Sequence, residues 1–123
     1  MSRILLVEDN EMNRDMLTRR LERKGFVIES AGDGEEALQK IASSMPDLVL
    51  MDMNLPIRNG WSTCRELRAN PDTERLPVIA LTAHAMAEDE QKALAAGCND
   101  YTTKPIDFPL LLAKINKLLE DES

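Results

Sequence analysis

Acidic, hydroxyl and amine side chains follow four of the short strand-type segments of the chain. These residues are Glu8 and Asp9 after RILLV, Asp52 after DLVLM, Thr82 after PVIAL and Lys104 just beyond DYTT. A buried carboxylate is costly to remove from water unless something pairs with it. If the segment ends meet, three carboxylates repel one another, and a hard divalent cation relieves that repulsion.

The same residues suit magnesium and phosphoryl chemistry. Mg²⁺ takes oxygen ligands and keeps several waters, so we expect Asp9 and Asp52 as direct ligands and Glu8 as a ligand through water. A backbone carbonyl just after Asp52 can complete the shell. Lys104 and Thr82 offer an ammonium and a hydroxyl to the phosphoryl oxygens. Each acid alone is equally consistent with a helix cap or a solvated residue; the whole set favours a magnesium and phosphoryl site.

Strand-type and helix-type segments alternate five times and must position these residues. The expected strands are 3–7, 27–31, 47–51, 77–81 and 100–103. The expected helices are 11–24, 33–42, 61–69, 86–96 and the segment that follows Asp107. This alternation predicts an α/β fold with right-handed crossovers, in which one doubly wound parallel sheet is covered on both faces. Ligands of such sheets bind beyond the carboxyl ends of the strands.

Local signals support the helices. Asn10 and Asp107 can cap the first and last helices, and Asp33 with Glu36 forms a capping box at the second. In the first helix four apolar residues fall on one side, as in a core-facing stripe: Met12, Met16, Leu17 and Leu21.

Length, composition and charge limit the class of protein. The chain has 123 residues, of which 43% are hydrophobic and 30% charged, which indicates one globular domain over residues 1–123. A net charge of −7 argues against a nucleic-acid surface. No apolar run approaches the roughly 20 residues of a membrane span, and the start turns acidic too soon for a signal peptide. Cys64 and Cys98 form no CxxC motif and are interpreted as reduced, small apolar fillers of a cytoplasmic protein.

Four motifs in this order carry a family resemblance: LLVEDN, LVLMDMNLP, ALTAH and YTTKPID. Over essentially its whole length the chain resembles the response-regulator receiver domains of two-component signalling, which have the CheY-like fold. The resemblance implies a five-stranded parallel sheet in the order 2-1-3-4-5 with five helices. Each motif alone is a weak signal, whereas all four on these strand ends form a specific one.

The resemblance also implies roles for the site residues. Asp52 is the expected phosphoacceptor, which takes a phosphoryl group from a sensor histidine kinase or a histidine phosphotransfer protein. Glu8, Asp9 and Asp52 hold Mg²⁺ together with the backbone carbonyl of Asn54. Lys104 pairs with the phosphate, and the Lys104–Pro105 peptide bond is expected to be cis.

A switch follows from the same resemblance. Thr82 is expected to move toward the phosphoryl oxygens and Tyr101 to turn inward, which changes the surface of the fourth helix, fifth strand and fifth helix for a downstream effector protein. The small Ala83 leaves the phosphate reachable, while Asn54 and His84 tune the rates of phosphorylation and dephosphorylation. Such a domain catalyses its own modification and is not a turnover enzyme. It is a monomer or a phosphorylation-dependent dimer.

Three other functions compete with this one. A phosphatase with an aspartate nucleophile needs a second acid two residues later, where this chain has Asn54. A flavodoxin-like nucleotide or flavin binder needs glycines and donors after the first strand, where VEDNEMN offers acids. A phosphorylation-independent, receiver-like interaction scaffold is the main alternative, although Asp9, Asp52 and Lys104 are all present. We expect either a stand-alone receiver or a domain cut from a longer kinase or regulator, and the initiating Met1 and the terminal LLEDES slightly favour the first.

Overall fold

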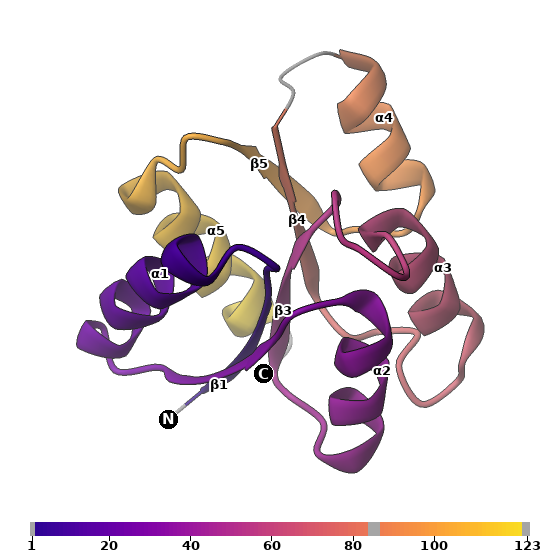
Figure 1. Ribbon diagram of the computed structural model, residues 1–123, viewed down its shortest axis with the longest axis horizontal. Coiled ribbons are helices and arrows are strands. Elements are labelled where there is room, and N and C mark those ends of the chain that lie inside the picture. The colour runs from indigo at the N-terminus through magenta and orange to yellow at the C-terminus, as the bar shows by residue number, and fades with distance from the viewer. Residues whose placement is uncertain (1, 84–86, 122–123) are drawn as a thin grey trace.

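The fold is a five-stranded parallel sheet flanked by five helices, seen in a computed structural model that describes residues 2–83 and 87–121 (Figure 1). The strands are β1 (Arg3–Val7), β2 (Val27–Ala31), β3 (Leu48–Asp52), β4 (Val78–Thr82) and β5 (Asp100–Thr103). The helices are α1 (Glu11–Arg23), α2 (Gly34–Ser43), α3 (Gly60–Ala69), α4 (Ala87–Ala95) and α5 (Phe108–Asp121). The strand order is β2-β1-β3-β4-β5, as expected. Within these two ranges, no helix combines the length and the apolar character that crossing a bilayer requires.

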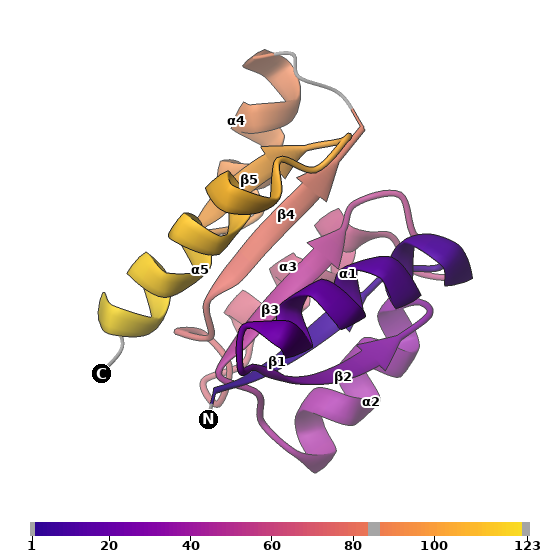
Figure 2. The same cartoon turned by 90° about the vertical axis from the view of Figure 1, so that its left-hand side faces the viewer.

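Helices α1 and α5 cover one face of the sheet, and α2, α3 and α4 cover the other (Figures 1 and 2). The side chains of β1 alternate between two separate cores. Ile4 and Leu6 join the core under α1 and α5, whereas Leu5 and Val7 join the opposite one. Burial on both faces explains why the inner strands β1, β3 and β4 are nearly continuous apolar runs rather than alternating patterns. The doubly wound α/β architecture is therefore confirmed.

The third and fourth strands end one residue later than predicted. Asp52 and Thr82 are the last residues of β3 and β4, so each belongs to the sheet ladder rather than to a loop. Asp52 is in register with Leu81, and Thr82 with Thr103. The sheet thus fixes the backbone of both polar residues.

The predicted helix caps are present. Asn10 and Asp107 each accept a backbone N–H from the first turn of the following helix. Asp33 Oδ1 accepts the N–H of Glu36 at 2.8 Å, and Glu36 Oε1 accepts a backbone N–H at 2.8 Å in return. That second donor is Gly32 rather than Asp33, so the capping box reaches back one residue further than in its usual form.

The predicted apolar side of α1 is only half buried, which corrects one expectation. Leu17 and Leu21 are buried in the core, but Met12 and Met16 are exposed. Leu17 and Leu21 occupy the contact with the sheet, while Met16 lines an open cleft between α1 and residues 104–106. The apolar side of α1 therefore extends beyond the part of the helix that packs against the sheet.

Candidate functional site

Asp52 lies at the end of the most deeply buried part of the sheet. Residues 48–51 are fully buried, and Asp52 itself is buried. Both of its carboxylate oxygens have a donor: the backbone N–H of Asn54 reaches Oδ1 at 2.9 Å, and Lys104 Nζ reaches Oδ2 at 2.9 Å. The carboxylate is consequently held in one orientation at the carboxyl edge of the sheet.

The loop after β3 folds back against Asp52. Met53 donates its N–H to the Leu81 carbonyl at 3.0 Å, and Gly60 donates its N–H to the Met53 carbonyl at 3.1 Å. A Cβ on Gly60 would lie 2.5 Å from the Asp52 carbonyl oxygen, so only glycine fits there without a shift. Asn59 caps α3 and so fixes the other end of the loop.

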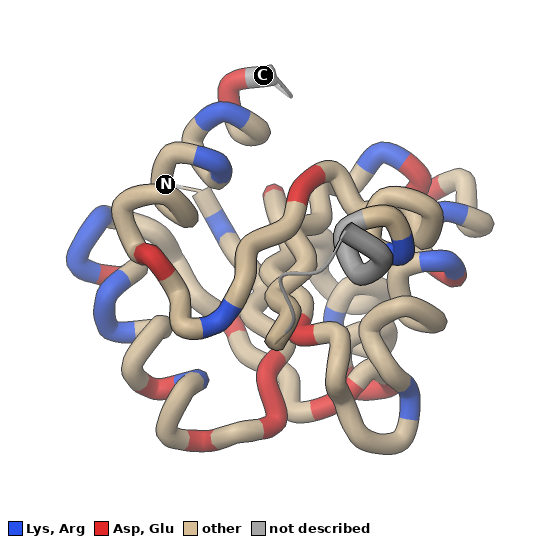
Figure 3. The backbone as a smooth tube through the Cα atoms, turned by 90° about the horizontal axis from the view of Figure 1, so that it is seen from above, with Lys and Arg blue, Asp and Glu red and all other residues tan. Residues whose placement is uncertain are grey.

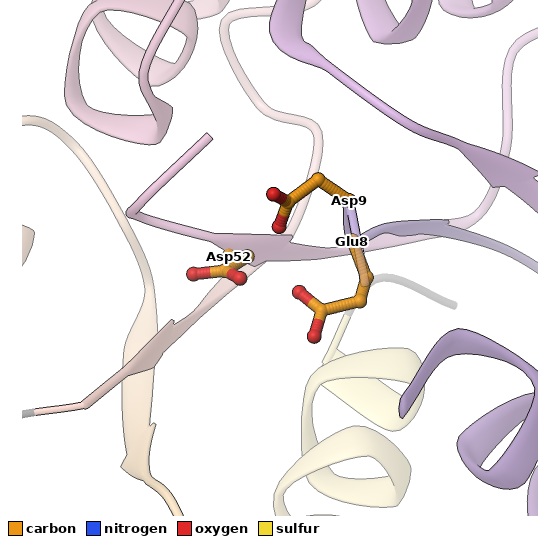
Figure 4. Close-up of side chains that lie close together, drawn as sticks. All are labelled: Glu8, Asp9 and Asp52. Carbon is orange, nitrogen blue, oxygen red and sulfur yellow. The ribbon is translucent and has the colours of Figure 1, made fainter. Parts of the chain in front are cut away.

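Glu8 and Asp9 approach Asp52 from the end of β1. The Glu8 N–H continues the sheet ladder to the Ala31 carbonyl, and Arg14 holds the Glu8 carbonyl at 3.0 Å. Carboxylate oxygens of Glu8, Asp9 and Asp52 lie within 4.8 Å of one another, and Figure 4 shows the three groups pointing together. Glu8 is buried and Asp9 is exposed, so the cluster opens to solvent on one side. Figure 3 views the chain from above and shows acidic segments near the middle of this view.

Lys104 is positioned by the neighbouring strand end. Its N–H donates to the Thr82 carbonyl at 2.8 Å, which extends the β4–β5 ladder by one bond. Its Nζ lies 2.9 Å from Asp52 Oδ2 and 3.4 Å from Glu8 Oε1. The Lys104–Pro105 peptide bond is cis, as predicted. One ammonium therefore faces two buried carboxylates.

Burial and this charge imbalance together shift the pKa values of all three groups. Burial, followed by a hydrogen bond to Asp52 and its negative charge, raises the pKa of Glu8 to about 7. Burial alone would raise the pKa of Asp52, but hydrogen bonds from Glu8, Lys104 and the Asn54 N–H together lower it. Burial opposes the charge of Lys104, yet pairing with both carboxylates raises its pKa. Asp52 thus stays ionised, while Glu8 tends to hold a proton when no cation is bound.

The donor set fits a hard divalent cation. Three carboxylates converge, and in the part of the chain that the structure describes, Glu8 Oε2 is buried without a hydrogen-bond partner. A buried acceptor without a donor is costly, and a cation or a water bound to it would satisfy it. The oxygen ligands and the partly open geometry are those that Mg²⁺ uses.

Thr82, Ala83 and Pro105 of the predicted site lie near the carboxylate cluster. Thr82 is buried at the end of β4, and Ala83 next to it is exposed. Ala83, Lys104 and Pro105 line a cleft of about 490 Å³ that Glu8 also borders. The cleft therefore reaches the carboxylate cluster.

Tyr101 lies on β5, three residues before Lys104. It is half-buried, packs against the core on the side of α2, α3 and α4, and has the Lys114 ammonium 5.0 Å from its ring centre. His84 lies outside the described residues.

Sequence reasoning missed several residues that support the site. Asn13 lies beside Glu8, where its hydrogen bond offsets a small part of the rise in the Glu8 pKa, and Arg14 holds the Glu8 carbonyl. Gly60 allows the loop to reach Asp52. The pair Asn59–Gly60 before a helical pattern was a usable signal for a capped turn, whereas the contacts of Asn13 and Arg14 depend on how α1 lies against β1.

Both the sequence and the fold are similar to those of known proteins. A family model for the response regulator receiver domain matches residues 4–116. The phosphate regulon transcriptional regulatory protein PhoB of Rhizobium meliloti (strain 1021) is 38% identical over 117 residues, which cover 95% of this chain and 52% of that protein. The chain therefore spans about half the length of this relative.

Two solved structures are similar over nearly the whole chain. The receiver domain of the Francisella response regulator 1452 superposes with a TM-score of 0.94 at 28% identity and covers 100% of both chains. The receiver domain of the sensor histidine kinase PA1611 from Pseudomonas aeruginosa PAO1 superposes with a TM-score of 0.90 at 36% identity, covering 97% of this chain and 98% of that one. The latter crystal structure has a magnesium ion coordinated in its active site cleft.

Proposed function

Because this chain belongs to the receiver-domain family of two-component response regulators, we propose that it accepts a phosphoryl group on Asp52 in a Mg²⁺-dependent reaction. Receiver domains are regulatory domains rather than turnover enzymes. The observation that carries the proposal is the Asp52 carboxylate at the end of a buried strand, 2.9 Å from the Lys104 ammonium and beside two further carboxylates. The receiver unit is proposed to comprise residues 1–123.

The nucleophile is a carboxylate oxygen of Asp52. Its lowered pKa keeps it ionised at neutral pH. In transfer from the phosphohistidine of a sensor kinase or phosphotransfer protein, a P–O bond forms at Asp52, the P–N bond breaks, and the imidazole leaves and takes up a proton. Lys104 already lies at Asp52 Oδ2, so its ammonium can pair with the incoming phosphoryl oxygens.

The proposed magnesium ligands are Asp9, Asp52 and the Asn54 carbonyl, with Glu8 bound through water. When bound, Mg²⁺ supplies positive charge that neutralises the phosphoryl oxygens during transfer. Glu8 must release its proton to join this shell, and its pKa of about 7 makes that release easiest above neutral pH. The magnesium in the cleft of the Pseudomonas receiver domain supports this assignment.

The output of phosphorylation is a shift of population between two states. Thr82 moves toward the phosphoryl oxygens and Tyr101 turns inward, which alters the α4–β5–α5 surface that contacts an effector protein. Ala83 leaves the phosphate accessible, and Asn54 and His84 set the lifetime of the acyl phosphate. The modified protein acts as a monomer or dimerises through the altered surface.

Incubation with acetyl phosphate, with and without Mg²⁺, tests the proposal. We expect one phosphoryl adduct by intact mass that needs Mg²⁺, is labile to hydroxylamine and is lost in Asp52→Asn. Asp47→Asn is the matched control, because Asp47 precedes β3 and accepts the backbone N–H of Arg3 at the opposite end of the sheet. Absence of the adduct with both acetyl phosphate and a histidine-phosphate donor would refute phosphorylation. The phosphorylation-independent scaffold would then be the better description.

A further inference from the structure

Two cysteines that are 34 positions apart touch inside the molecule. Cys64 lies on α3, and Cys98 lies between α4 and β5. The two Sγ atoms are 3.5 Å apart, and both side chains are free thiols. Cys64 is fully buried, and Cys98 is 5% exposed. The sequence interpretation of two separate apolar fillers therefore misses a direct sulfur–sulfur contact.

Arg68 holds the two segments together. It lies one helical turn after Cys64 on α3. Its Nε donates to the Gly97 carbonyl at 2.7 Å, and its Nη2 donates to Asn99 Oδ1 at 2.9 Å. Gly97 and Asn99 are the residues on either side of Cys98. A single planar guanidinium thus fixes the position of Cys98 relative to the helix that carries Cys64.

We propose that Cys64 and Cys98 are a peroxide-oxidisable dithiol that closes into an intramolecular disulfide between α3 and the segment before β5. The two Sγ atoms have to approach from 3.5 Å to the roughly 2.04 Å of a disulfide, a movement of about 1.5 Å. Two thiols already in contact at an inter-element boundary provide a modification site that phosphorylation at Asp52 does not use. The proposal is independent of the phosphoacceptor function.

The oxidation balances with a hydroperoxide as the oxidant. The Cys64 thiolate attacks one peroxide oxygen, the O–O bond breaks and the other oxygen leaves as hydroxide, so Cys64 becomes a sulfenic acid. The Cys98 sulfur then attacks Cys64, an S–S bond forms, the S–O bond breaks and the oxygen leaves as water. In total, two thiols and one hydrogen peroxide give one disulfide and two waters.

The surroundings favour thiolate at Cys64. The hydrogen bond donated by Cys98, followed by the positive charges of Arg68 and Arg65, lowers the pKa of Cys64 although burial opposes this. The pair lies close to the surface, because Cys98 keeps some exposure and the next residue, Asn99, is exposed. The side of Cys98 is therefore the side from which a molecule as small as hydrogen peroxide would have to enter to reach the buried Cys64.

The test treats the folded protein with hydrogen peroxide, then denatures it and counts free thiols by alkylation and peptide mapping. We expect both thiols to be lost together and a peptide that links Cys64 to Cys98 to appear. Cys64→Ala and Cys98→Ala should each yield no internal cross-link. The exposed Met12 and Met16 gain oxygen under the same treatment, so their oxidation is the internal control that peroxide was active.

Arg68→Lys tests the positioning of the pair. Lysine keeps the charge but lacks the fork that reaches both neighbours of Cys98, so we expect disulfide closure to slow by roughly threefold or more. Unchanged closure in this variant would overturn the positioning role of Arg68. The dithiol itself would be overturned if Met12 and Met16 oxidise while both thiols survive in wild type. Sulfinic acid or intermolecular cross-links in place of the internal disulfide would also overturn it.

Discussion

Charged groups meet at both ends of the sheet, in two different settings. At the amino end, Arg3 pairs with Glu29 at 3.3 Å, with side chains 38% and 42% exposed, and Asp47 accepts the Arg3 N–H at 2.7 Å. At the carboxyl end, Lys104 pairs with Asp52 and Glu8, and these side chains are only 28%, 4% and 4% exposed.

The contrast separates structural charge from functional charge. An exposed pair is solvated and screened, and it typically stabilises the fold by less than about 1 kcal/mol. The buried cluster has two desolvated carboxylates for one ammonium, and Glu8 Oε2 has no hydrogen-bond partner. Such an arrangement lowers the stability of the fold until a cation binds. An imbalance of this kind therefore indicates a cation-binding site rather than a stabilising ion pair.

The largest expected effect comes from removal of the buried ammonium. Lys104→Met leaves two buried carboxylates facing each other, so we expect the free energy of unfolding without metal to fall by about 3 kcal/mol. Arg3→Met at the opposite end should cost less than about 1 kcal/mol. Urea denaturation in a metal chelator measures both. Equal losses in the two variants would remove the distinction between the two ends.

The next effect tests how closely the β3–α3 loop packs on Asp52. A Cβ on Gly60 would lie 2.5 Å from the Asp52 carbonyl oxygen and 2.8 Å from Met53 Cα, so Gly60→Ala should cost about 2 kcal/mol. Gly32→Ala is the matched control, because its Cβ would meet only the Arg14 side chain at 3.8 Å. Thermal unfolding of both variants compares the positions. If Gly60→Ala leaves the stability unchanged, the loop can shift to make room for the added Cβ, and the close packing on Asp52 is contradicted.

The pH dependence sharpens the comparison at Glu8. The pKa of Glu8 is about 7 in the folded protein, against an ordinary value of 4.5. Between these two pH values the folded protein holds a proton on Glu8, whereas the unfolded chain has released it. Stability without metal should therefore fall as the pH rises through that window, because the folded protein then binds more protons than the unfolded chain. Glu8→Gln should remove this fall and be the more stable protein at pH 8.

The control for that pH series is Glu29→Gln, whose carboxylate pairs with Arg3 in solvent. It should leave the pH dependence of unfolding as in wild type. Urea midpoints measured across the window in a metal chelator provide the comparison. If Glu8→Gln and wild type follow the same pH curve, the buried cluster does not hold the proton.

The smallest effect concerns backbone strain beside the site. Ile57 has φ of 63°, which is unfavourable for a β-branched residue, and its side chain is exposed. Ile57→Gly should stabilise the fold by about 0.5 kcal/mol, because it relieves strain without loss of packing. Met16→Gly, at an exposed position within α1, should instead cost about 1 kcal/mol. Calorimetry measures the change in stability of both variants. A loss of stability in Ile57→Gly would contradict the proposal that the Ile57 backbone is strained.

The sequence predicted what depends on local pattern and on strand ends. Caps at Asn10 and Asp33 were predictable because the acceptor and its donor lie three residues apart. The convergence of Glu8, Asp9, Asp52 and Lys104 was predictable because parallel strands end at one edge of a sheet.

Contacts between distant segments could not be predicted in this way. Periodicity placed Met12 and Met16 with Leu17 but did not show how far the sheet extends beneath α1. The Cys64–Cys98 contact depends on how α3 packs beside the α4–β5 segment, and no spacing in the chain encodes it. The left-handed backbone conformation of Ile57 could not be predicted, because isoleucine rarely adopts it.

The most direct measurement of the central claim is a Mg²⁺ titration of thermal unfolding at pH 8 for wild type and Asp9→Asn. Asp9 is exposed, so its substitution changes the ligand set with little effect on packing. We expect Mg²⁺ to raise the unfolding temperature of wild type in a saturable way and to affect Asp9→Asn much less. No rise in wild type, or the same rise in both proteins, would contradict the assignment of the buried carboxylate cluster as a magnesium site.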